Sequence, residues 1–155
     1  MKRSVLLVCI FSLLLAACST APQATDTPQA TAVGTSAAPT SLDGTRWVLE
    51  SLGANGEDSP VIPGSILTLQ FQPNGQVSGN SGCNSFGGSY EVRDSRITFL
   101  NLVSTLMACA DNAVNQQESQ YLQALNSAVA YELAADRLTI TYGTGSGRLN
   151  FVPAD

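Results

Sequence analysis

Cys83 and Cys109 are the residues of this chain best suited to chemistry. Cys83 lies in a glycine-rich stretch, SGNSGCNSFGGSY (residues 78–90), and Cys109 ends the segment TLMAC (105–109). A cysteine is nucleophilic as a thiolate, which needs a nearby base or cation. The chain has no histidine, and its one lysine is Lys2. The residues beyond the N-terminus therefore offer no Cys–His, Ser–His or Ser–Lys pair.

The same scarcity argues against other kinds of site. A zinc site with four nitrogen or sulfur ligands needs more donors than these two cysteines supply. A phosphate loop needs a lysine and a helix directly after its glycines, whereas a strand pattern follows here. Carboxylates remain as candidate catalytic groups. They lie in two sequence clusters: Glu57 with Asp58, and Glu132 with Asp136. Nothing indicates that two of them face each other across a cleft, as glycosidase chemistry requires. We therefore expect no catalytic residue, no metal and no cofactor.

The first 17 residues have the layout of a secretory signal peptide. A basic start, MKR, precedes the apolar run SVLLVCIFSLLLAA, which is too short for a membrane span. The run ends in LAAC, which resembles the lipobox of bacterial lipoproteins. That resemblance implies cleavage between Ala17 and Cys18 and acylation of Cys18. The alternative is an ordinary signal peptide in which Cys18 has no role.

The rest of the chain divides into a tether and a domain. Residues 18–41 are expected to be the lipidated cysteine and a disordered tether, because Thr, Ala, Pro, Gln and Ser dominate them and Asp26 is their one charge. Residues 42–155 suffice for one domain with one core. We expect a monomer in the cell envelope, lipid-anchored and outside the cytoplasm.

Charge narrows the choice of partners. Without Lys2 and Arg3, five arginines face twelve acidic residues, a net charge of −7. An acidic surface disfavours nucleic acid and the anionic lipid surface. Attachment to the membrane would therefore depend on the N-terminal lipid. The expected partner is an unknown small molecule or an envelope protein.

From Leu42 onward, short apolar runs alternate with turn signals, which is typical of an antiparallel sandwich or barrel. The Asn-Gly pair at 74–75 indicates a tight hairpin, and residues 53–64 are expected to form a loop. The expected strands are 45–52, 65–71, 76–80, 88–92, 96–100, 130–135, 137–142 and 148–152. The fold class is therefore mostly β, a curled sheet of about eight strands with one inserted helix.

The helix is expected at residues 112–129, covering or plugging the sheet. Tyr121, Leu122, Leu125 and Val129 form one apolar stripe at helical spacing. Asp111 or Asn112 can cap its N-terminus. Four polar residues are expected to keep the outer face in water: Gln116, Gln117, Glu118 and Gln120.

Two motifs together resemble the META/HslJ family of small envelope domains. The first comprises Gly82, Cys83, Asn84, Phe86, Gly88 and Tyr90, and the second comprises Thr105, Met107 and Cys109. The likeness extends from LDGTRW (42–47) to about residue 152. The turn after Tyr90 departs from it, since RDS (93–95) stands where the family usually has a glycine.

The resemblance implies a small antiparallel barrel, somewhat lipocalin-like, with one helix. It also implies an association with stress or drug tolerance. No catalytic residues are established for the family, so none is carried over. We interpret the motif residues as structural, with the glycines marking crowded backbone.

Cys83 and Cys109 are the two cysteines of the expected domain, and the export signal places them where disulfides persist. A bridge between them is the favoured interpretation. The alternative is a pair of buried thiols that act as small hydrophobic side chains.

Three functions remain. The first is a non-enzymatic, membrane-tethered lipoprotein that binds a small molecule or partner and supports envelope stress or drug tolerance. The second is a structural or inhibitor-type module that contacts another protein through an exposed loop such as 53–64. A hydrolase that uses carboxylates alone is a remote third. An open apolar cavity would favour a ligand carrier, and a filled interior would favour contact with a protein.

We predict that Cys18→Ser releases the protein from the membrane. The substitution removes the thiol that would carry the acyl chain, and each buried CH₂ of such a chain contributes about 0.8 kcal/mol. Fractionation of cells and the mass of the N-terminal peptide provide the measurement. Unchanged membrane retention, with no acyl mass on the unaltered protein, would refute the lipobox interpretation.

Overall fold

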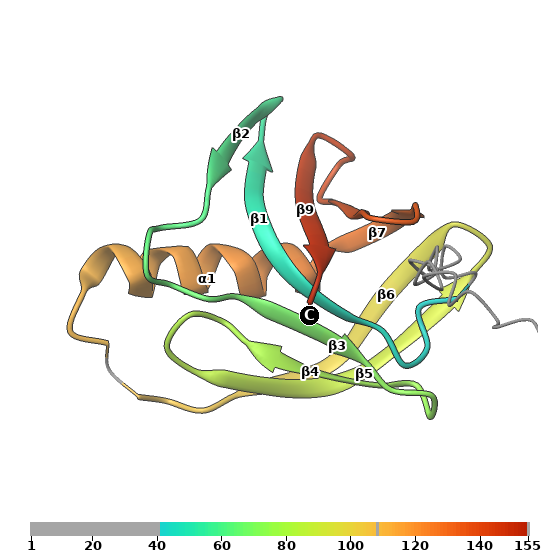
Figure 1. The fold of residues 1–155 in the computed structure, drawn as a ribbon, viewed down its shortest axis with the longest axis horizontal. Helices are drawn as coiled ribbons and strands as arrows, with labels where there is room; N and C mark the ends of the chain where they lie inside the picture. Colours follow the sequence, from blue (N-terminus) through green and yellow to red (C-terminus); the bar gives the residue numbers. More distant parts are fainter. Residues whose placement is uncertain (1–40, 108, 155) are drawn as a thin grey trace, which may run out of the picture. The chain divides into compact units, whose positions relative to one another are not determined.

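The computed structural model describes residues 41–107 and 109–154 (Figure 1). The expected signal peptide (1–17), Cys18 and nearly all of the tether lie outside the described residues. Among those described, no helix is long and apolar enough to cross a membrane.

The described chain is mostly β with one helix, as expected. The elements are β1 (Arg46–Ala54), β2 (Glu57–Pro60), β3 (Thr68–Phe71), β4 (Gln76–Asn80), β5 (Ser85–Arg93), β6 (Arg96–Ser104), α1 (Asn112–Asn126), β7 (Ala128–Leu133), β8 (Leu138–Tyr142) and β9 (Gly147–Pro153). All strand pairs are antiparallel, in the order β6-β5-β4-β3-β1-β9-β8-β7, and β2 pairs with β1 beside this path.

The sheet curls until its two outer strands approach each other. The N–H of Tyr131 in β7 donates to the carbonyl of Ser95, which precedes β6, at 2.9 Å. This contact makes the sheet nearly closed and barrel-like, and α1 lies against it (Figure 1). The helix stands between β6 and β7 in the sequence, so it connects the two edges that meet.

Large side chains fill the interior of the curled sheet. The fully buried ones are Trp47, Leu67, Leu69, Phe71, Val77, Ile97, Tyr121, Leu125, Leu138, Ile140, Leu149 and Phe151. The helix α1 contributes Tyr121 to the centre of this core. The centroid of the Tyr121 ring lies 5.9 Å from that of Phe86 and 6.3 Å from that of Phe151. Burial raises the pKa of Tyr121, so its hydroxyl stays protonated and donates to the Thr68 carbonyl at 3.1 Å.

The helix is shorter than its sequence pattern suggests. Asp111 is the N-cap, accepting from the Ala113 N–H at 2.7 Å, but the helix ends at Asn126. Val129 belongs to β7 and is 42% exposed, so its expected place in the helical stripe is wrong. Alternation in the next strand begins at Ala128, which pairs with Tyr142, and strand pairing prevails over one further helical turn.

The expected loop at 53–64 contains a strand that the sequence analysis missed. Asn55 and Gly56 both have positive φ, 54° and 89°, and they connect β1 to β2 as a two-residue hairpin. The Asn-Gly signal was therefore present, but the polar β2 has no apolar alternation to indicate a strand. The described residues form nine strands, where about eight were expected.

The β5–β6 hairpin forms although its turn has no glycine, which the resemblance to the family would lead us to expect there. In the RDS turn between β5 and β6, Asp94 adopts a φ of 55°. Aspartate tolerates this left-handed conformation better than most residues with a Cβ. The expected hairpin therefore forms on Asp94.

Candidate functional site: the disulfide corner

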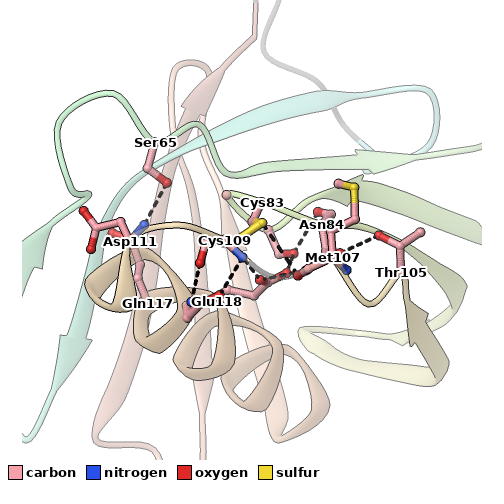
Figure 2. Close-up of a disulfide and its surroundings, with 12 residues drawn as sticks. Ser65, Cys83, Asn84, Thr105, Met107, Cys109, Asp111, Gln117 and Glu118 are labelled. Carbon is pink, nitrogen blue, oxygen red and sulfur yellow. Dashed lines mark hydrogen bonds between the residues drawn. A yellow bond between two sulfur atoms is a disulfide. The ribbon is translucent and has the colours of Figure 1, made fainter.

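Cys83 and Cys109 form the favoured disulfide, with their Cα atoms 5.9 Å apart (Figure 2). Cys83 lies in the turn between β4 and β5, and Cys109 lies between β6 and α1. We call the surroundings the disulfide corner, which comprises Ser81–Ser85, Thr105–Met107, Cys109 and Glu118. The corner joins two sheet segments to the start of the helix.

The Asn84 side chain connects the two sequence motifs. Its Oδ1 accepts from the N–H of Met107 and from the hydroxyl of Thr105, both at 2.7 Å. Its Nδ2 donates to the Met107 carbonyl at 3.1 Å and to Oε2 of Glu118 at 3.0 Å. One buried amide thus makes four hydrogen bonds, which is the full capacity of an asparagine side chain.

Glu118 is the buried acid of the corner, and the sequence analysis placed it wrongly. It was expected on the outer face of α1, yet it is 7% exposed. Its carboxylate accepts from the Ser81 hydroxyl and from Asn84. The spacing of Glu118, Tyr121 and Leu125 places them on one helical face, so the sequence did contain a signal.

Gln117 is likewise buried, contrary to the expected polar outer face. Its Oε1 accepts from the N–H of Ile62 at 2.8 Å, and its Nε2 donates to Oγ of Ser65 at 3.0 Å (Figure 2). The helix is therefore fastened by the polar contacts of Gln117 and Glu118, one turn before Tyr121. A pattern based on apolar residues could not reveal such contacts.

Gly82 confirms the expectation of crowded backbone. Its φ is 113°, and a Cβ there would lie 2.9 Å from Oγ of Ser65. Its N–H donates to Oδ1 of Asn80 at 2.8 Å, which fixes the turn before Cys83. A residue with a side chain would be strained at this position.

The other motif residues of β5 point into the core or meet neighbouring strands, outside the disulfide corner. Phe86 and Tyr90 are buried, and the Tyr90 ring packs against Phe71 with centroids 4.8 Å apart. The Tyr90 hydroxyl donates to Asp43. A Cβ on Gly88 would lie 2.8 Å from the Leu100 carbonyl, beside a register shift in the ladder. These residues build the sheet, as expected of structural motif positions.

An apolar segment that is exposed to solvent adjoins the disulfide corner. In this segment, residues 103–107, Val103 is 71% exposed, Leu106 99% and Met107 60%. Its backbone is nevertheless fixed, because the Thr105 N–H donates to Ser85 and Asn84 binds both backbone groups of Met107. Three large apolar side chains are thus exposed to solvent on an anchored backbone.

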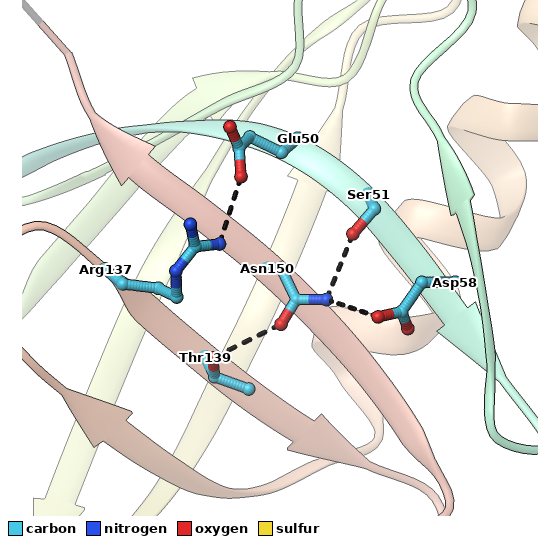
Figure 3. Close-up of polar contacts among 6 residues, drawn as sticks. All are labelled: Glu50, Ser51, Asp58, Arg137, Thr139 and Asn150. Carbon is cyan, nitrogen blue, oxygen red and sulfur yellow. Dashed lines mark hydrogen bonds and ion pairs between the residues drawn. The ribbon is translucent and has the colours of Figure 1, made fainter.

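The acidic candidates from the sequence lie elsewhere, at the surface. Asp58 accepts from Nδ2 of Asn150 at 3.2 Å, and Asn150 also contacts Ser51 and Thr139 (Figure 3). Glu57, Glu132 and Asp136 are exposed. The hydrogen bonds of Asn150 join β1, β2, β8 and β9. Such contacts are typical of a solvated polar surface.

A groove of about 910 Å³ lies outside the barrel, between the β1–β2 hairpin and α1. Its lining includes Leu52, Ser59, Gln116, Gln120 and Tyr142. The groove is open to solvent, and its lining contains no basic residue. It lacks the enclosed apolar character of a typical small-molecule site.

The fold and the corner define a class of protein, a small antiparallel barrel-like domain with one helix fastened by a disulfide. Residues 40–155 match the META domain family. The chain belongs to this family, as the GCN and TLMAC motifs suggested.

Solved structures support this assignment. An NMR structure of a protein from Burkholderia xenovorans shares 30% identity, with a TM-score of 0.62, over 73% of this chain and 83% of that one. A second NMR structure shares 27% identity, with a TM-score of 0.57, over 73% and 92%. A crystal structure of a DUF4847 family protein from Bacteroides vulgatus ATCC 8482 has 14% identity, a TM-score of 0.56 and coverage of 72% and 93%, which shows the fold alone. No curated protein matches this chain significantly.

We predict that Asn84→Ala lowers the free energy of unfolding by about 2–4 kcal/mol, because it leaves several buried donors and acceptors without partners. The matched control is Asn126→Ala, which removes an exposed asparagine that donates only to the Leu122 carbonyl. Urea unfolding of both variants provides the comparison. Equal stability of the two variants would contradict the role given to Asn84.

Proposed function

We propose that this protein is a non-enzymatic, lipid-anchored binding domain outside the cytoplasm, which docks its apolar segment into a pocket of a partner protein. The observation that carries the proposal is the exposure of Leu106 and Met107 on an anchored backbone. Anchoring matters because a segment that is already ordered loses little conformational entropy when it binds.

The filled interior supports contact with a protein over carriage of a ligand. The positions that a lipocalin-like carrier would leave open hold Trp47, Phe71, Tyr121 and Phe151, all buried. The described hollows are open grooves at the surface. The second function from the sequence is therefore favoured in part, with residues 103–107 in place of the loop 53–64 as the contact.

The net charge of the chain indicates the chemical character of the partner's binding surface. The chain beyond the signal has a net charge of −7, which disfavours insertion of the apolar segment into anionic lipid. A protein pocket with an apolar floor and a basic rim matches both the segment and the acidic domain. A role in envelope stress or drug tolerance would follow from the state of that partner.

The chemistry of the corner supports a role without catalysis. Asn84, Ser81 and Glu118 use their polar atoms on one another and on the backbone of Met107. Neither histidine nor a lysine beyond Lys2 is present to activate them.

We predict that the double substitution Leu106→Ser with Met107→Ser weakens partner binding by about thirtyfold, which corresponds to about 2 kcal/mol. A photo-crosslinking residue at position 106, used in the producing cell, first identifies the partner. The affinity is then measured with both purified proteins. The double variant should stay folded, because both side chains are exposed.

The matched control is Val129→Ser, which removes an exposed apolar side chain from β7. It should leave the affinity unchanged. Crosslinks to lipid, no specific crosslink at position 106, or equal affinity of all variants would each overturn the proposal.

A further inference from the structure

We propose that reduction of the Cys83–Cys109 disulfide converts the disulfide corner into a binding site for one zinc-like divalent cation. The ligands are the two cysteine sulfurs and the carboxylate of Glu118. The site is independent of the proposed partner contact. Its occupancy depends on the redox state of the cysteines, since a disulfide supplies no thiolate to a metal.

The geometry of the three side chains fits one cation. One ligand atom from each lies within 4.8 Å of the other two. Oε2 of Glu118 is 3.9 Å from Sγ of Cys109. A sulfur and an oxygen bound to the same zinc ion lie at most about 4.4 Å apart, given the usual bond lengths. The carboxylate therefore needs no large movement to reach a metal held by Cys109.

The carboxylate is already oriented and takes part in no ion pair among the described residues. The Ser81 hydroxyl and the Asn84 amide donate to its two oxygens, as outer groups commonly do for carboxylates that bind metals. Neither of the two ion pairs among the described residues includes Glu118. A buried carboxylate is costly without a compensating charge, and a divalent cation would supply one.

Reduction of the disulfide requires a reductant that supplies two electrons. A dithiol reductant attacks one sulfur of the disulfide, and the mixed disulfide then resolves as the reductant closes its own disulfide. Two electrons and two protons pass to Cys83 and Cys109, which become thiols. Binding of the cation displaces both protons and leaves two thiolates on the metal. Three protein ligands leave a fourth position for water.

The charges of the bound state are favourable. Two thiolates and one carboxylate carry three negative charges beside one another, which a divalent cation offsets in part. Metal and reduction should therefore stabilise each other, and reoxidation of the cysteines should release the metal.

Cd²⁺ is the probe, because its thiolate complexes absorb in the ultraviolet. The domain is reduced with a phosphine under anaerobic conditions, freed of reductant and titrated. We expect one Cd²⁺ per reduced domain with thiolate-to-metal absorption, and none for the oxidised protein. Glu118→Gln should weaken binding by roughly tenfold or more, since it removes one ligand and keeps both thiols.

Asp111→Asn is the matched control, because it removes an exposed carboxylate near Cys109 and keeps an acceptor for the helix cap. It should leave the Cd²⁺ affinity unchanged. X-ray absorption on the unaltered reduced protein serves if Glu118→Gln does not fold, and it should show two sulfur ligands with oxygen. No binding, a shell of sulfur alone, or equal weakening by both substitutions would overturn the proposal. So would a reduced domain that is unfolded and does not refold with Cd²⁺.

Discussion

The four hydrogen bonds of Asn84 are the interactions on which the disulfide corner depends. They connect the β4–β5 turn, the segment after β6 and the helix through one buried amide. The disulfide joins the same two backbone segments covalently, and Glu118 adds the helix. Two motifs that are distant in the sequence therefore act as one structural unit. A buried polar network of this kind is stabilising only when all its members have partners.

The proposed function lies at the surface of the domain. Buried side chains from α1 and the sheet fill the interior, which supports contact with a protein over carriage of a ligand. The apolar segment 103–107 is exposed, and Asn84 fixes the backbone of its last residue, Met107. Rigidity and exposure together distinguish a contact surface from a loop that happens to be apolar. The similar solved structures share the fold at 30% and at 14% identity.

Sequence periodicity was sufficient for most of the sheet. The capping residues indicated the start of the helix, and the number of cysteines with the export signal indicated their pairing. Periodicity failed where polar residues make the structure. β2 pairs through its backbone and has no apolar alternation, so the sequence analysis missed it although the Asn55–Gly56 turn was a signal. Glu118 looked solvated because its partners, Ser81 and Asn84, are far away in the sequence. The sequence also suggested a further helical turn to Val129, where pairing of β7 with β8 prevailed.

Native-state hydrogen exchange at the Met107 amide tests the central claim most directly. The side chain of Met107 is exposed, but its N–H donates to Oδ1 of Asn84. The corner as described requires this amide to exchange about as slowly as the Leu49 amide, which is bonded to Leu67 within the sheet. Exchange of the Met107 amide at the rate of an unprotected loop, with Leu49 still protected, would contradict the account.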